Sequence, residues 1–88
     1  MNGPYRVGIT VRAARDLERL PEKIAAACVG FIYGPLAENP HRVGKELHDD
    51  LARFRSARRG DYRVIYAIRD DEQLIEIVHT DRRSDVYR

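Results

Sequence analysis

The chain has 88 residues, of which 43% are hydrophobic and 34% charged, so we expect residues 1–88 to form one domain with a modest core and not a disordered chain. No apolar run is long enough to span a membrane and the N-terminus lacks a signal-peptide pattern, which predicts a cytoplasmic protein. The net charge of +2 does not by itself indicate a nucleic-acid-binding protein. The single cysteine, Cys28, excludes an intrachain disulfide and is expected in the core.

The first third of the chain predicts a short strand followed by two helices. Residues 5–9 alternate apolar with other side chains, and Thr10 offers a hydroxyl to cap a helix that begins at Val11. This first helix should end at Leu20. Spacings of three residues give it a predicted apolar face made of Val11, Ala14, Leu17 and Leu20.

Pro21 suits the first position of a second helix. Its predicted apolar stripe comprises Ile24, Ala27, Cys28, Phe31 and Ile32. Gly34-Pro35 should stop this helix, and residues 36–50 predict a loop in which His41 and His48 are exposed.

The second half predicts three strands. Residues 52–69 form two β runs around Gly60-Asp61, which is typical of a hairpin; residues 70–72 make a polar turn, and residues 73–80 a last strand. The order is β-α-α-β-β-β. It predicts an α+β domain in which an N-terminal strand and a helical hairpin pack on a mainly antiparallel four-stranded sheet.

Positive charge is concentrated in the hairpin. Residues 52–69 hold six arginines against Asp61, a local net charge of +5, so the rest of the chain carries −3. Of the 16 basic residues in the chain, 14 are arginine. Two explanations account for this bias equally well. One is codon usage; the other is selection for guanidinium groups, which bind phosphate bidentately and stay charged at any working pH. The uneven distribution nevertheless places the function on this hairpin.

A turn centred on Gly60-Asp61 sets Arg58 opposite Arg63 and Arg59 opposite Tyr62. Opposed guanidinium groups repel each other, which favours a bound anion between Arg58 and Arg63; a solvated outer face with arginines protecting a sheet edge is the structural alternative. A three-residue turn at 70–72 would also set His79 opposite Arg63, where it could act as an acid or base or simply fill a strand end.

The sequence has no Gly-rich phosphate loop, no His/Cys/carboxylate cluster with metal-ligand spacing and no Ser-His-Asp pattern, so we expect neither metal nor cofactor. Catalysis would then depend on arginine, tyrosine or histidine. Cleavage of RNA suits such a set. The RNA supplies its own nucleophile, the 2′-hydroxyl, so the protein need only orient it, neutralise the phosphate and move protons.

Several segments resemble the RelE group of the RelE/ParE toxin superfamily. They are Arg59-Gly-Asp-Tyr-Arg-Val-Ile-Tyr66, Arg82-Arg-Ser-Asp-Val-Tyr-Arg88, and residues 14–21 and 39–45, so the resemblance covers nearly the whole chain. It implies the toxin of a type II toxin–antitoxin system. The resemblance to the RelE group further implies a ribosome-dependent endoribonuclease, an mRNA interferase that cuts mRNA in the A site and so inhibits translation. The implied partners are a cognate RelB-like antitoxin, the ribosome and mRNA. Operator DNA would be reached through the antitoxin, and no interaction with a membrane is implied.

The resemblance also implies roles for individual residues. Arg63 matches the arginine that stabilises the transition state, Arg83 the arginine that assists the leaving group, and Tyr87 the tyrosine that activates the 2′-hydroxyl or stacks on the base. Arg82 competes with Arg83 for the second role, and Ser56 stands where a further basic residue often occurs. The expected RNA- or phosphate-binding residues are Arg58, Arg59, Arg55, Arg82 and Lys45.

Two other functions stay open. A ParE-like poison of DNA gyrase shares the fold but acts by binding, and it would need no proton-transfer residue such as Tyr87. A toxin weakened by the serine at position 56 would serve mainly as the antitoxin-bound corepressor.

Overall fold

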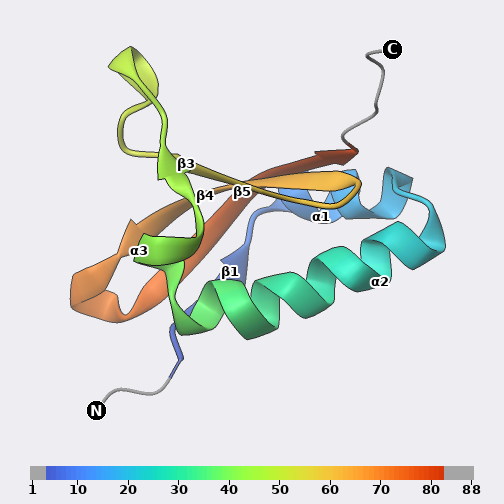
Figure 1. Cartoon of the computed structure of the whole chain (residues 1–88), viewed down its shortest axis with the longest axis horizontal. Coiled ribbons are helices and arrows are strands. Elements are labelled where there is room, and N and C mark those ends of the chain that lie inside the picture. The colour runs from blue at the N-terminus through green and yellow to red at the C-terminus, as the bar shows by residue number, and fades with distance from the viewer. Residues whose placement is uncertain (1–3, 83–88) are drawn as a thin grey trace.

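The computed structural model describes residues 4–82, and its strands form one five-stranded sheet in the order β1-β5-β4-β3-β2 (Figure 1). The strands are β1 (Arg6–Ile9), β2 (Lys45–Glu46), β3 (Arg55–Arg59), β4 (Tyr62–Arg69) and β5 (Leu74–Arg82). Neighbouring strands are antiparallel except for β1 and β5, which run parallel. The predicted α+β class and mainly antiparallel sheet are confirmed.

The sheet has one strand more than the four that the sequence predicts. Lys45 and Glu46 of β2 pair with Ser56 and Arg55 of β3, inside the segment predicted to be a loop. Two charged residues carry no alternation of apolar and polar side chains, so only the neighbouring edge of β3 makes them a strand. The same segment contains a helical turn, α3 (Pro40–Val43), and the 3₁₀ turn η2 (Asp49–Leu51).

Helix α1 (Val11–Arg19) begins where it was predicted, because the Thr10 hydroxyl accepts a hydrogen bond from the Ala13 amide at 3.1 Å. Its inward face was predicted only in part: Leu17 and Leu20 pack against the core as predicted, whereas Val11 and Ala14 are exposed. Val11 is 70% exposed, whereas Ala13 is fully buried. The helix packs along β5, and this contact turns the face that carries Ala13 and Asp16 inward.

Helix α2 (Glu22–Phe31) buries the Cys28 and Phe31 side chains as predicted. Gly34-Pro35 does not end the helical path. The backbone continues through a π-helical turn, η1 (Ile32–Leu36), which accommodates Pro35. A regular α-helix would not accommodate it, because proline lacks the N–H and clashes with the preceding turn. Among the helices of residues 4–82, none is long and apolar enough to cross a membrane.

The core lies between the helices and one face of the sheet (Figure 1). The buried hydrophobic side chains on this face of the sheet are Ala57, Tyr62, Val64, Tyr66, Ile75 and Ile77. Each buried tyrosine hydroxyl has an acceptor: Tyr66 donates to the Pro40 carbonyl at 2.7 Å and Tyr62 to the Ala27 carbonyl at 3.3 Å. These two bonds tie β4 to α3 and to α2.

The pairing of β3 with β4 is the predicted one, with Arg58 opposite Arg63. The pairing of β4 with β5 differs, because His79 lies opposite Ile65 and Asp81 lies opposite Arg63. The prediction of His79 opposite Arg63 was therefore wrong by two residues.

Two features cause this shift. The link between β4 and β5 holds four residues instead of three, since Gln73 adopts a left-handed conformation (φ 54°) after the 3₁₀ turn η3 (Asp70–Glu72). A β-bulge then adds one residue, Val78, to β5. It lies opposite the step between Ile65 and Tyr66 of β4, where the register shifts. A shift of two residues leaves His79 on the predicted face of the sheet.

Replacing Gly44 by alanine should destabilise the fold, because a Cβ there would clash with the Tyr66 hydroxyl and lie 2.9 Å from the Ser56 carbonyl oxygen. We expect the free energy of unfolding, measured by urea denaturation, to fall by about 1–3 kcal/mol. Gly30→Ala is the matched control. A Cβ at Gly30 meets no atom within 4 Å, so alanine in α2 should raise the free energy of unfolding by about 0.5–1 kcal/mol. Equal stability of Gly44→Ala and the parent chain would contradict this account of the Tyr66 contact.

Candidate functional site

Alternation along the strands divides the sheet into the core face and an opposite face, here called the open face. Two cross-strand rows lie on the open face at the Gly60-Asp61 end of the hairpin. The first row contains Arg58, Arg63 and Asp81; the second contains Lys45, Ser56, Ile65 and His79. The structure thus brings three of the predicted residues, Arg63, Arg58 and Lys45, to one face.

Arg63 forms an ion pair with Asp81, its partner across the sheet. Arg63 Nε donates to Asp81 Oδ1 at 3.2 Å, and Nη2 donates to Oδ2 at 2.8 Å. The two side chains are 42% and 36% exposed, so the pair lies at the surface. Repulsion between Arg58 and Arg63 led us to expect an anion beside them, and the chain supplies one itself in the Asp81 carboxylate.

His79 lies between two carboxylates. Its Nδ1 is 2.7 Å from Oδ2 of Asp16 on α1, and its Nε2 is 3.3 Å from Oδ2 of Asp81. Ionised carboxylates only accept hydrogen bonds, so both contacts are hydrogen bonds when the imidazole carries both ring protons. The result is a continuous series of contacts from α1 to Arg63, through Asp16, His79 and Asp81.

Asp16 is the buried end of this series, with a side chain that is 10% exposed. Burial is the largest single effect on its pKa and would raise it. The Thr80 amide, which donates to Asp16 Oδ2 at 3.2 Å, and the nearby His79 and Arg12 outweigh burial, so the pKa of Asp16 lies below its ordinary value of 3.8. Asp16 is therefore ionised at neutral pH.

The other predicted basic residues lie on the core face. Arg59 stacks over the Phe31 ring at 4.6 Å from its centroid. Arg55 Nη2 donates to the carbonyls of His41 and Gly44, each at 2.8 Å. Arg82 lies opposite Tyr62 and is exposed. The structure does not bring Arg55, Arg59 or Arg82 to the face that carries Arg63.

Arg83 and Tyr87, the other two predicted catalytic residues, lie outside the described residues. Arg82, at the end of β5, immediately precedes Arg83 in the sequence. Within residues 4–82, no group of three or more His, Cys, Asp or Glu side chains is arranged to hold a metal ion.

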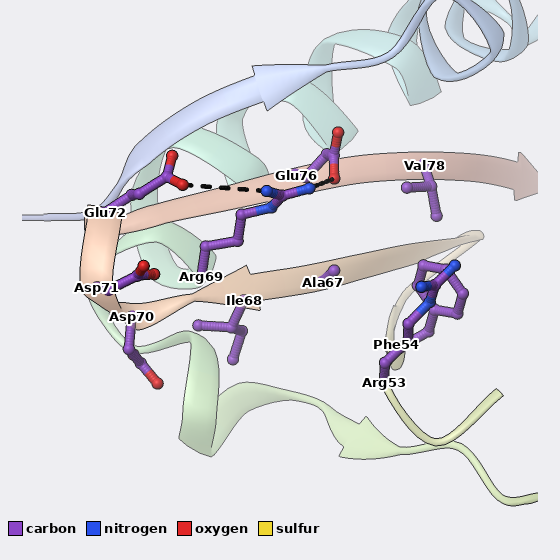
Figure 2. Close-up of a pocket in the computed structure, with 10 residues that line it drawn as sticks. All are labelled: Arg53, Phe54, Ala67, Ile68, Arg69, Asp70, Asp71, Glu72, Glu76 and Val78. Atoms are coloured by element: carbon purple, nitrogen blue, oxygen red, sulfur yellow. Dashed lines mark hydrogen bonds and ion pairs between the residues drawn. The ribbon is translucent and has the colours of Figure 1, made fainter.

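The far end of the open face has a different charge. It contains a hollow of about 640 Å³ between Phe54, Ala67 and Val78 and the acidic turn after β4 (Figure 2). Arg69 lies across this end between Glu72, at 4.0 Å, and Glu76, at 3.2 Å, as Figure 2 shows. Carboxylates surround the arginine there, so this end is less suited to a phosphate than the end that carries Arg58 and Arg63.

Sequence reasoning missed Asp16 and Asp81. The predicted last strand ends at residue 80, before Asp81, and the predicted apolar face of the first helix does not include Asp16. Counting four residues in the β4–β5 link and one bulge would have set Asp81 opposite Arg63, but Gln73 is not a residue type that signals a left-handed turn.

Removing the charge of Asp16 should weaken the fold at neutral pH but not in acid. Asp16→Asn should lower the free energy of unfolding by about 1–3 kcal/mol at pH 7, because His79 and the Thr80 amide lose a charged acceptor. The folded-state pKa of Asp16 is depressed, so its stabilisation is present above about pH 4 and lost as the pH falls further. Urea denaturation at pH 7 and pH 3 measures this difference, with the exposed Asp71→Asn as the control. A constant gap between parent and Asp16→Asn at both pH values would contradict the assignment.

Comparison with known proteins identifies the family. The family model described as the ParE toxin of the type II toxin-antitoxin system parDE matches residues 7–87. Toxin RelE of Mycobacterium tuberculosis is 65% identical over 85 residues, covering 97% of this chain and 88% of that protein. Toxin RelG of the same organism is 48% identical, covering 97% and 98% of the two chains.

Solved structures agree with this assignment. A chain in the crystal structure of the toxin-antitoxin complex RelBE2 from M. tuberculosis matches with a TM-score of 0.92 and 46% identity, covering 97% of this chain and 98% of that one. The isolated RelE toxin of E. coli matches with a TM-score of 0.74 over 94% of this chain and 88% of that one; at 12% identity it shows the same fold alone. The chain is therefore a RelE-like member of the RelE/ParE superfamily of toxins from type II toxin–antitoxin systems.

Proposed function

We propose that this toxin is a ribosome-dependent, metal-free endoribonuclease that cleaves mRNA in the ribosomal A site and so inhibits translation. The observation that carries the proposal is the cluster of Arg63, Arg58 and Lys45 on one open face of a rigid sheet. Three cations there can hold the RNA backbone, while the Arg63–Asp81 pair fixes the arginine nearest the centre of the sheet.

Cleavage would proceed by attack of the 2′-hydroxyl on the adjacent phosphate. The 2′-oxygen forms a bond to phosphorus, the bond from phosphorus to the 5′-oxygen breaks, and a 2′,3′-cyclic phosphate and a 5′-hydroxyl result. Arg63 would stabilise the negative charge that grows on the phosphate oxygens. By resemblance, Tyr87 would take the 2′ proton or stack on the base, and Arg83 would assist the departing 5′-oxygen.

A RelB-like antitoxin is the partner that we propose. The RelBE2 structure from M. tuberculosis is a complex of toxin and antitoxin, and its toxin-like chain matches this one over nearly its whole length. The excess of positive charge at Arg58 and Lys45 supports an acidic antitoxin segment that covers this end of the open face. Operator DNA would be reached through the antitoxin.

A ParE-like poison of DNA gyrase is the second candidate, because the matching family model describes ParE toxins. Such a toxin would act by binding and would not cut RNA. A weak toxin that serves as corepressor is the third, because Ser56 occupies the open face beside Ile65, where a basic residue would add to the phosphate-binding charge.

Replacing Arg63 should strongly reduce mRNA cleavage. After induced expression of the toxin and mapping of mRNA 5′ ends, the parent chain should produce cuts with codon periodicity on translated messages. Arg63→Ala should reduce the number of cuts by about 10²–10³-fold, the usual cost of removing one transition-state donor. Tyr87→Phe should also reduce the cuts if the Tyr87 hydroxyl moves the proton. Arg69→Ala is the matched control, since Arg69 lies on β4 and the same face but far from Arg58. Intact messages accompanied by DNA damage would instead identify the gyrase poison.

Reversing a charge on the open face should weaken antitoxin binding. We expect Arg58→Glu to raise the Kd for the cognate antitoxin by at least about tenfold, with a smaller effect at high salt. Isothermal titration calorimetry at two salt concentrations measures this change. Arg15→Glu makes the same charge change on the exposed side of α1 and should leave the Kd nearly unchanged. An unchanged Kd for Arg58→Glu would show that the antitoxin inhibits without covering this face.

A further inference from the structure

The Arg63 guanidinium is held at one edge only. Asp81 accepts from Nε and from one proton of Nη2, which are two of the five N–H donors of the group. Among the described residues, Nη1 donates no hydrogen bond to a side chain or carbonyl. Nη1 and the second Nη2 proton form the outer end of the group, which has the geometry to bind a phosphate bidentately. Asp81 therefore directs this outer end without occupying it.

Asp81 is itself held in place from α1. It lies near the end of β5 with a side chain that is 36% exposed, and an isolated surface carboxylate would orient an arginine only weakly. His79 contacts Asp81 Oδ2 at 3.3 Å and is anchored by Asp16 at 2.7 Å. Asp16 also accepts from the Thr80 amide. The fully buried Ala13, one turn earlier in α1, fixes the helix that carries Asp16.

We propose that Asp16, His79 and Asp81 are positioning residues that hold Arg63 ready for the scissile phosphate. In this proposal they do not touch the RNA. They act only by holding the Arg63 guanidinium group in one direction. This inference rests on the proposed ribonuclease function. Misplacing a group that stabilises the transition state lowers the rate of the chemical step far more than the strength of substrate binding.

The opposite arrangement would have Asp81 compete with the phosphate. In that case the carboxylate would occupy the place of the RNA, and removing it would strengthen binding. The two arrangements differ in kinetics, because loss of a positioning residue lowers kcat, whereas loss of a competitor lowers KM.

The first arm of the test needs no activity. In ¹⁵N NMR spectra of the full chain, the Arg63 Nε–H resonance, assigned by its disappearance in Arg63→Lys, should shift and exchange faster with water in Asp81→Ala. His79→Asn should have a similar but smaller effect, because asparagine can replace Nδ1 toward Asp16 but does not reach Asp81. Glu76→Gln is the matched control: Glu76 pairs with Arg69 on the same two strands, so its replacement should shift Arg69 and not Arg63. An Arg63 resonance unchanged in both Asp81→Ala and His79→Asn would overturn the positioning role.

The second arm measures cleavage of mRNA on programmed ribosomes. Asp81→Ala should lower kcat by about ten- to hundredfold with KM changed by less than about twofold, and His79→Asn should lower kcat by about tenfold. Asp81→Glu, which keeps the carboxylate, should recover part of the loss, and Glu76→Gln should match the parent chain. A lower KM with an unchanged kcat in Asp81→Ala would overturn positioning in favour of competition. A parent chain that cuts no mRNA would reject the proposed function itself, whereas the NMR arm judges the contact series separately.

Discussion

The antiparallel pairing of β4 with β5 is the constraint on which both the core and the candidate site depend. Between Arg69 and Tyr66 the two strands pair in one register, and from Ile65 onward β5 is displaced by one residue at the bulge. Without the bulge, alternation would turn His79 toward the core and place Thr80 beside Arg63. The single extra residue, Val78, therefore puts Asp81 and His79 on the open face and buries Thr80.

Charge on the open face is balanced differently at its two ends. Near the Gly60-Asp61 turn, Asp81 offsets only part of the positive charge of Arg58 and Arg63, which leaves this end attractive to an anion. At the other end, Glu72 and Glu76 surround Arg69, and an acidic turn borders the hollow. Arg63 and Arg69 thus lie on one strand with different numbers of carboxylate neighbours, which is why we propose Arg63 and not Arg69 for phosphate binding.

Local patterns predicted the elements well where they were long or capped. The Thr10 cap and the Gly60-Asp61 hairpin both follow from residue types at fixed spacing. Patterns failed where neighbouring elements decide. β2 is a strand only beside β3, α1 is rotated by its contact with β5, and Pro35 lies within a helical path that continues through a π turn.

The sequence by itself determined the α+β class, the hairpin register that sets Arg58 against Arg63, and the motifs that mark the RelE/ParE family. These depend on contacts between residues close in the chain, where spacing and turn chemistry are enough. Only the tertiary structure decided that Asp81 pairs with Arg63, that Asp16 anchors His79, and that Arg55 and Arg59 face the core. Asp16 and His79 are 63 residues apart in the chain. The left-handed Gln73 and the bulge at Val78 set the register that brings them together. Glutamine does not indicate a left-handed turn, and valine does not indicate a bulge, so the sequence alone does not predict this register.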